Sequence, residues 1–190
     1  MNTYVQAPFL PGFGARVELH WSVLLVAAGI MAASFRTPIN GAALVAAYFG
    51  ILYVHELGHA FVARRLGYRP YEIRLSFVHG RVCFEAPRTE RDAALIAWGG
   101  ASAQLAVALP LVLLAQLTNA GSLPVLGPAI AFLGYLSLLI AAVNLAPARG
   151  LDGYIAWRLF RNLKLPTRHR PKAPKSVAGS KVIKGPWAGP

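Results

Sequence analysis

Long uncharged stretches of hydrophobic residues dominate the chain. No Asp, Glu, Lys or Arg occurs in the 56 residues from Ala93 to Ala148, and a helix that crosses the hydrocarbon core needs roughly 20 apolar residues. This stretch is long enough for two spans, and breakers between Thr118 and Pro128 separate them. Two further apolar stretches precede it. The pattern predicts four transmembrane helices and a short half-helix, at about 17–35, 39–65, 93–117, 127–147 and 152–163.

The composition favours a membrane protein over a soluble domain. Of 190 residues, 56% are hydrophobic and 14% are charged, whereas an average soluble domain has about 25% charged residues. A cleaved signal peptide is a poor account of the first span, because the single basic residue Arg16 precedes it and no clear cleavage site follows. The single cysteine, Cys83, excludes an intramolecular disulfide framework. We therefore expect an all-α polytopic membrane protein.

Two segments differ from these helices. Between the second and third spans, side-chain character alternates with a period of about two on both sides of Gly80, which predicts a small surface β-hairpin within 68–88. From Pro166 onward the chain is rich in proline and basic residues and has no acidic residue, which is typical of disorder. We expect a core of residues 1–165 and a basic tail, 166–190, held near anionic lipids. Nucleic-acid binding is not expected, because the tail lacks a folded module.

The basic residues predict the orientation of the spans. In the four-span arrangement, eighteen of the nineteen Lys and Arg residues fall on one side, and only Arg36 falls on the other. Because Lys and Arg are enriched in cytoplasmic loops, both termini should lie in the cytoplasm. The membrane should be the cell (inner) membrane.

Two acidic residues, Glu56 and Asp152, accompany the spans at depth, where a carboxylate costs about 2.5–3.5 kcal/mol on insertion scales. Glu56 belongs to the segment His55-Glu56-Leu57-Gly58-His59. Two histidines four residues apart share one helix face and can bind one zinc ion. Glu56 then points beside the metal, where a general base is needed, and Gly58 lets another backbone or a substrate come close. The alternative interpretation is that the polar residues of this segment form a cluster of interhelical hydrogen bonds.

A catalytic zinc ion usually has three protein ligands and one open position. Asp152 is the best candidate for the third ligand, because Pro147 and Gly150 break the helix before it and irregular backbone at membrane depth lines a cavity or is buried in protein. The second and fourth spans both run toward the cytoplasmic side, so Asp152 reaches a depth similar to that of the histidine pair. The remaining histidines lie at the start of a span, in the hairpin turn and in the tail: His20, His79 and His169.

The motif at 55–59, together with Asn144-Leu145-Ala146-Pro147 and Leu151-Asp152-Gly153, resembles the site-2 protease family of intramembrane zinc metalloproteases. The signatures of that family are HExxH and NxxPxxxLDG, and both are complete here and in the expected order. The resemblance covers roughly residues 10–162 and indicates a compact form without a PDZ-like or CBS-like domain. Many relatives have Gly-Pro-x-x-Asn where this chain has Ala101 and Gln104.

The resemblance implies a zinc-dependent endopeptidase that cleaves within or near the transmembrane helix of a single-pass membrane protein. One zinc ion per chain would be held by His55, His59 and Asp152, and Glu56 would activate a zinc-bound water. Two amide side chains would contact the substrate, Asn144 and Gln104. Because an intact helix has every amide paired, the substrate must unwind, and the edge of the hairpin could pair with the unwound segment.

Three other functions stay open on the sequence alone. The chain could be a catalytically silent relative that binds transmembrane helices as an adaptor or chaperone, a transporter or metal-permeation protein, or another zinc hydrolase, such as one that acts on lipids. The complete motifs count against the first function. The lack of further polar residues in the spans counts against the second.

Overall fold

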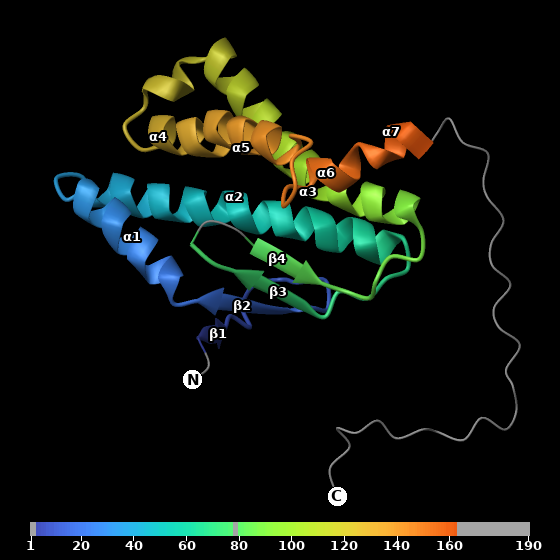
Figure 1. Ribbon diagram of the computed structural model, residues 1–190. Coiled ribbons are helices and arrows are strands. Elements are labelled where there is room, and N and C mark those ends of the chain that lie inside the picture. Colours follow the sequence, from blue (N-terminus) through green and yellow to red (C-terminus); the bar gives the residue numbers. More distant parts are fainter. Residues whose placement is uncertain (1–2, 78–79, 163–190) are drawn as a thin grey trace, which may run out of the picture.

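The computed structural model describes residues 3–77 and 80–162, and α2 (Pro38–Arg65) runs through its middle (Figure 1). A small β-sheet lies along one side of α2. On the other side lie α3 (Glu90–Leu117) and a continuous helical rod made of α4 (Leu126–Ile130), a π-helical segment (Ala131–Leu136) and α5 (Ser137–Asn144). A 3-10 turn, η1 (Asn119–Ser122), leads from α3 toward the rod.

Local sequence signals explain where the long helices begin and end. Pro38 is the first residue of α2, where its missing N–H and fixed φ do no harm. Arg64 and Arg65 lie in the last turn of α2, where positive charge is favourable near the carbonyl end of the helix dipole. Thr89 caps α3, since its Oγ1 accepts a hydrogen bond from the Asp92 N–H at 3.0 Å.

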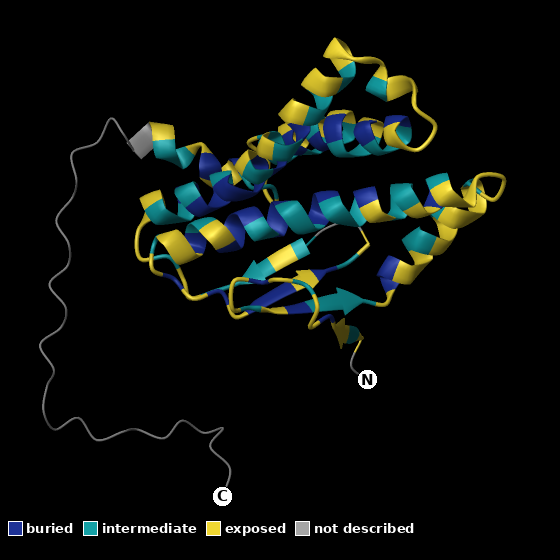
Figure 2. Ribbon diagram, turned by 180° about the vertical axis from the view of Figure 1, so that it is seen from behind, coloured by how far each residue is buried: buried dark blue, intermediate teal, exposed yellow. Residues whose placement is uncertain are grey.

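Three helical segments in the described part of the chain are long and apolar enough to cross a membrane: Pro38–Arg65, Glu90–Leu117 and Leu126–Asn144. They match the second, third and fourth predicted spans to within three residues. Large apolar side chains, including Leu113 and Leu139, are exposed on them. Figure 2 shows exposed residues along the outer parts of α1 (Ser22–Ala33) and α3. Lipid contact accounts for such surfaces, which soluble monomers rarely expose at this extent.

The helix in the region of the first predicted span, 17–35, is shorter than expected. The helix in this region, α1, covers Ser22–Ala33, which is 12 residues or about 18 Å, against a hydrocarbon core of about 30 Å. Residues Arg16–His20 form strand β2 instead. Apolar and polar residues alternate there, and a strand buries Val17 while it leaves Glu18 on the other face.

The predicted hairpin is confirmed, but it belongs to a larger sheet. Within the described residues the strand order is β1-β2-β3-β4. β1 (Tyr4–Gln6) pairs antiparallel with β2, β2 pairs parallel with β3 (Glu72–Leu75), and β3 pairs antiparallel with β4 (Gly80–Cys83). The inner face of the sheet and α2 share a hydrophobic core, made by Val17, Ile73 and Leu75 with Leu52 and Ala60.

The predicted short helix after the fourth span is present as two pieces. α6 (Gly153–Ala156) and α7 (Arg158–Asn162) both pack against α3. Asp152 directly precedes α6, at the end of an irregular turn in which Gly150 has a φ of +92°. The predicted basic tail lies outside the described residues, as do His79 and His169, and the division at residue 165 stays a prediction.

Candidate metal centre

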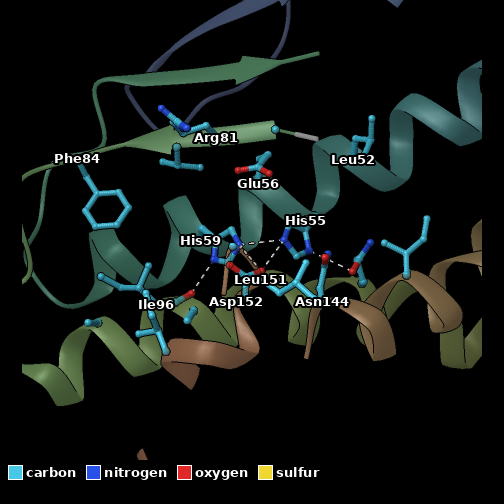
Figure 3. Close-up of a pocket in the computed structure, with 18 of the residues that line it drawn as sticks. Leu52, His55, Glu56, His59, Arg81, Phe84, Ile96, Asn144, Leu151 and Asp152 are labelled. Carbon is cyan, nitrogen blue, oxygen red and sulfur yellow. Dashed lines mark hydrogen bonds and ion pairs between the residues drawn. The ribbon is translucent and has the colours of Figure 1, made fainter. Parts of the chain in front are cut away.

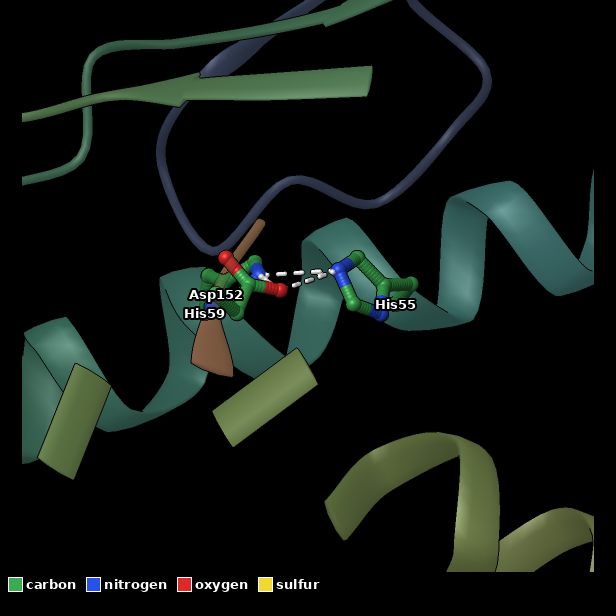
Figure 4. A group of neighbouring side chains, drawn as sticks. All are labelled: His55, His59 and Asp152. Atoms are coloured by element: carbon green, nitrogen blue, oxygen red, sulfur yellow. Dashed lines mark hydrogen bonds and ion pairs between the residues drawn. The ribbon is translucent and has the colours of Figure 1, made fainter. Parts of the chain in front are cut away.

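The two histidines of α2 and Asp152 meet in a cavity of about 540 Å³. α2 forms its floor, β4 one wall, and α3, the end of α5 and the turn before α6 the others (Figure 3). His55 Nε2 and His59 Nε2 are 3.0 Å apart. Asp152 Oδ2 lies 2.9 Å from the first and 3.2 Å from the second (Figure 4). Residues almost 100 positions apart in sequence thus present three ligand atoms to one point.

This donor set fits a zinc ion. Tetrahedral zinc with bonds of about 2.0–2.1 Å needs ligand atoms about 3.3 Å apart, and the three observed separations require outward shifts of only a few tenths of an ångström. Two imidazole nitrogens and one carboxylate oxygen are also donor types that catalytic zinc sites use.

The other nitrogen of each imidazole has a hydrogen-bond partner on α3. His59 Nδ1 lies 2.7 Å from the Ile96 carbonyl oxygen, and His55 Nδ1 lies 3.1 Å from Gln104 Oε1. Because both partners are acceptors, each Nδ1 must carry the proton, which leaves each Nε2 free to bind a metal. α3 therefore fixes both the tautomer and the ring orientation of the two histidines.

Glycines let α3 come close enough to do this. A Cβ atom at Gly58 would lie 2.3 Å from the Gly99 carbonyl oxygen, so the α2 and α3 backbones touch there. A Cβ atom at Gly100 would lie 2.5 Å from His59 Nε2 and 2.6 Å from His55 Cε1. The expectation that another backbone approaches Gly58 is confirmed.

Glu56 lies on the sheet side of the two histidines, beneath β4 (Figure 3). Its side chain is buried and rests against Gly80, where a Cβ atom would lie 2.3–2.5 Å from the carboxyl end of Glu56. The absence of a side chain at Gly80 thus gives the carboxylate its place. Glu56 is outside the group of three ligand atoms, as expected for a residue that acts beside a metal.

The two predicted substrate contacts have different surroundings. Asn144 lines the cavity near the end of α5. Gln104 also lines it, but its Oε1 is used by His55, and its Nε2 is buried without a hydrogen-bond partner among the described residues. His20 lies away from the cavity, where its Nδ1 is 2.7 Å from Ser22 Oγ. The sequence did not predict the roles of Gly80, Gly100 and the Ile96 carbonyl. Every residue has a backbone carbonyl, so the sequence gives no signal for the one at Ile96.

Comparisons with known proteins agree with this fold. No protein-family model matches the chain. A curated protein of Mycolicibacterium smegmatis named "Putative zinc metalloprotease Rip2" is 30% identical over 172 residues, which cover 74% of this chain and 64% of the relative. The structure of the site-2 protease from Methanocaldococcus jannaschii matches with a TM-score of 0.64 and 24% identity, and covers 86% of this chain and 74% of that one.

The class is therefore a helical membrane protein with a site-2-protease fold. The two matches confirm the resemblance to the site-2 protease family that the sequence motifs indicate. The chain spans 64% of the length of the curated relative.

Proposed function

We propose that this chain is a zinc-dependent intramembrane endopeptidase that cleaves within or near the transmembrane helix of a membrane protein. The observation that carries the proposal is the convergence of His55, His59 and Asp152 on one point with Glu56 beside it. Apolar helices of membrane-spanning length surround this group. Ionisable residues inside such helices are functional candidates by default, because burying them in lipid is unfavourable.

The three converging residues are the proposed ligands of one zinc ion per chain. A bound zinc ion would supply Lewis-acid polarisation of a carbonyl and a water of lowered pKa. Glu56 is the proposed general base, which accepts a proton from water in the cavity and returns it to the leaving amine. Its burial against Gly80 holds the carboxylate in one place.

The cavity offers two kinds of group to an unwound peptide. Asn144 and Gln104 line it with amide groups. Gln104 Nε2 is buried and has no hydrogen-bond partner among the described residues, so it would donate to a substrate carbonyl after a local shift that exposes it. β4 is at the edge of the sheet in the described part of the chain, and its residues form one cavity wall. An extended substrate segment placed beside β4 could take up its free backbone hydrogen-bonding groups.

The direct test is metal content followed by cleavage. We expect about one zinc ion per purified chain, lost in Asp152→Ala and in His55→Ala and kept in Glu56→Gln. The probe for cleavage is a fusion protein with one transmembrane helix that carries a Gly-Pro pair at its centre, reconstituted with the enzyme in liposomes. Cleavage by the parent and none by Glu56→Gln is the expected result.

Each other outcome is informative. Zinc without Glu56-dependent cleavage of any such helix would favour the silent adaptor. Zinc retained in Asp152→Ala would show that the third ligand is wrong. A well-folded parent without zinc would refute the proposal.

The proposed orientation places both termini in the cytoplasm. In a Cys83→Ser background, an impermeant thiol reagent added to intact cells should label Thr37→Cys and Asn119→Cys, which lie at the predicted outer loops, and should not label Arg69→Cys. Because α1 is short, Thr3→Cys, at an exposed residue before α1, is the critical position and should not be labelled. Labelling of Thr3→Cys together with Thr37→Cys and Asn119→Cys would show that α1 does not cross the membrane.

A further inference from the structure

The turn that carries Asp152 is closed by a tryptophan. Leu145 directly follows α5, and the last carbonyls of a helix have no partner within it. The indole N–H of Trp157 donates to the Leu145 carbonyl at 2.6 Å. This hydrogen bond joins residues twelve positions apart, and Asp152 lies between them.

The Leu145 carbonyl oxygen has a second contact, with Gly153. A Cβ atom at Gly153 would lie 2.2 Å from the Leu145 oxygen, so the backbone of Gly153 rests directly against it. The carbonyl is thus held between Gly153 and the Trp157 indole. Since Asn144 precedes Leu145 and Asp152 precedes Gly153, this arrangement sets the spacing between the two cavity residues of the turn.

The Trp157 indole is itself held by α3. Its ring lies edge-on to that of Trp98, with centroids 5.5 Å apart, and Phe160 packs on both rings. Trp98 donates its own indole N–H to the Ala156 carbonyl at 3.1 Å. Trp98 follows Ile96, whose carbonyl orients His59, by two residues. One turn of α3 therefore supports both the histidine and the segment that carries Asp152.

We propose that Trp157 is a positioning residue for the metal centre: its N–H fixes the turn at Leu145 and so holds the Asp152 carboxylate against the two histidines. This inference rests on the proposed function in so far as the centre binds zinc. Groups that hydrogen-bond a metal ligand typically change metal affinity by about 10- to 100-fold when they are removed, and we expect a comparable loss for Trp157, which holds the turn that carries the ligand. The indole ring provides packing, whereas the N–H provides the positioning, and the two can be separated.

The test uses Trp157→Phe, which keeps an aromatic ring between Trp98 and Phe160 but has no N–H. Trp21→Phe is the matched control, because Trp21 is an exposed tryptophan at the start of α1 that does not line the cavity. We would measure zinc affinity by competition with a chelator, the visible spectrum of the cobalt-substituted protein, and amide hydrogen exchange of segment 145–157 in the metal-free protein.

The expected result is a zinc affinity about 10- to 100-fold lower in Trp157→Phe, a changed cobalt spectrum and faster exchange in segment 145–157. Trp21→Phe should match the parent. Zinc affinity within twofold of the parent would overturn the proposal. If Trp157→Phe fails to fold, benzothienylalanine at position 157, which keeps the bicyclic ring and replaces N–H by sulfur, decides by the same criteria.

Failure of the proposed function would be recognised separately. If the folded parent binds no zinc, the metal centre is refuted, and hydrogen exchange alone then judges the role of Trp157. Faster exchange of segment 145–157 in Trp157→Phe than in Trp21→Phe would still show that the indole holds the turn. Equal exchange would overturn that role as well.

Discussion

Replacing Gln104 by leucine should weaken zinc binding through His55, which Gln104 orients. The side chain of Gln104 is 1% exposed, and its Oε1 lies 3.1 Å from His55 Nδ1. Leucine has a similar size and cannot accept a hydrogen bond. In the metal-free protein His55 can then move its proton to Nε2, where Asp152 Oδ2 lies 2.9 Å away. Zinc binding forces the proton back to Nδ1, where no acceptor remains.

The loss can be estimated from the burial of this nitrogen. A buried donor left without its partner costs about 1–3 kcal/mol, and each 1.4 kcal/mol is about tenfold in an equilibrium constant. Because the penalty falls on the zinc-bound state alone, zinc affinity should fall by about 5- to 150-fold. His55 is only 7% exposed, so water replaces the lost acceptor poorly, and the upper half of this range is expected.

The assay is competition for zinc between the purified protein and a chromophoric chelator. Gln104→Glu keeps an acceptor at the same place and should retain the affinity of the parent. Gln116→Leu, at an exposed glutamine of the same helix, controls for the loss of an amide on α3. An affinity of Gln104→Leu within twofold of the parent would refute the reasoning. Gln104→Glu also lacks the amide N–H, so zinc binding with reduced cleavage would indicate that this donor contacts substrate.

Two glycines provide the remaining predictions. Gly100→Ala should abolish zinc binding measured by metal analysis, because its methyl group would lie 2.5 Å from His59 Nε2 and 2.6 Å from His55 Cε1 and would push both rings from the ligand positions. Gly80→Ala should keep zinc and lower the cleavage rate of the model substrate by about 100-fold or more, since it displaces Glu56, the proposed general base. Gly29→Ala is the control: nothing lies within 4 Å of the new Cβ atom, so it should change neither the zinc content nor the cleavage rate. Unchanged zinc content in Gly100→Ala would contradict the steric argument for the histidines. Full cleavage by Gly80→Ala would contradict the role proposed for the place of Glu56.

The convergence of His55, His59 and Asp152 could be predicted because it depends on short-range geometry and on depth. Two histidines four residues apart must share a helix face, and a charge-free sequence fixes where that helix lies relative to the membrane. The position of Asp152 near the histidines could be predicted from the direction of the second and fourth spans and from the helix break that precedes Asp152. The structure brings the three residues together as predicted, although the first span is shorter than the one used in that argument.

The extra strands could not be predicted in the same way. β2 occupies five residues directly before an apolar helix, and a hydropathy pattern assigns them to that helix. What makes them a strand is parallel pairing with β3, in which Val17 lies opposite Ile73. Such a pairing joins segments more than fifty residues apart, and no local pattern contains it.

The orientation of the histidines depends on helix packing, which the motif does not encode. Any residue has a backbone carbonyl, so nothing about Ile96 marks it as the acceptor for His59. The carbonyl is placed there by the approach of α3 to α2, and that approach depends on the contact between Gly58 and Gly99. A side chain at either glycine would separate the helices and leave both Nδ1–H groups without acceptors while the HExxH motif stayed intact. The proposed zinc binding by this motif therefore requires the glycines of the helix contact as well as the histidines.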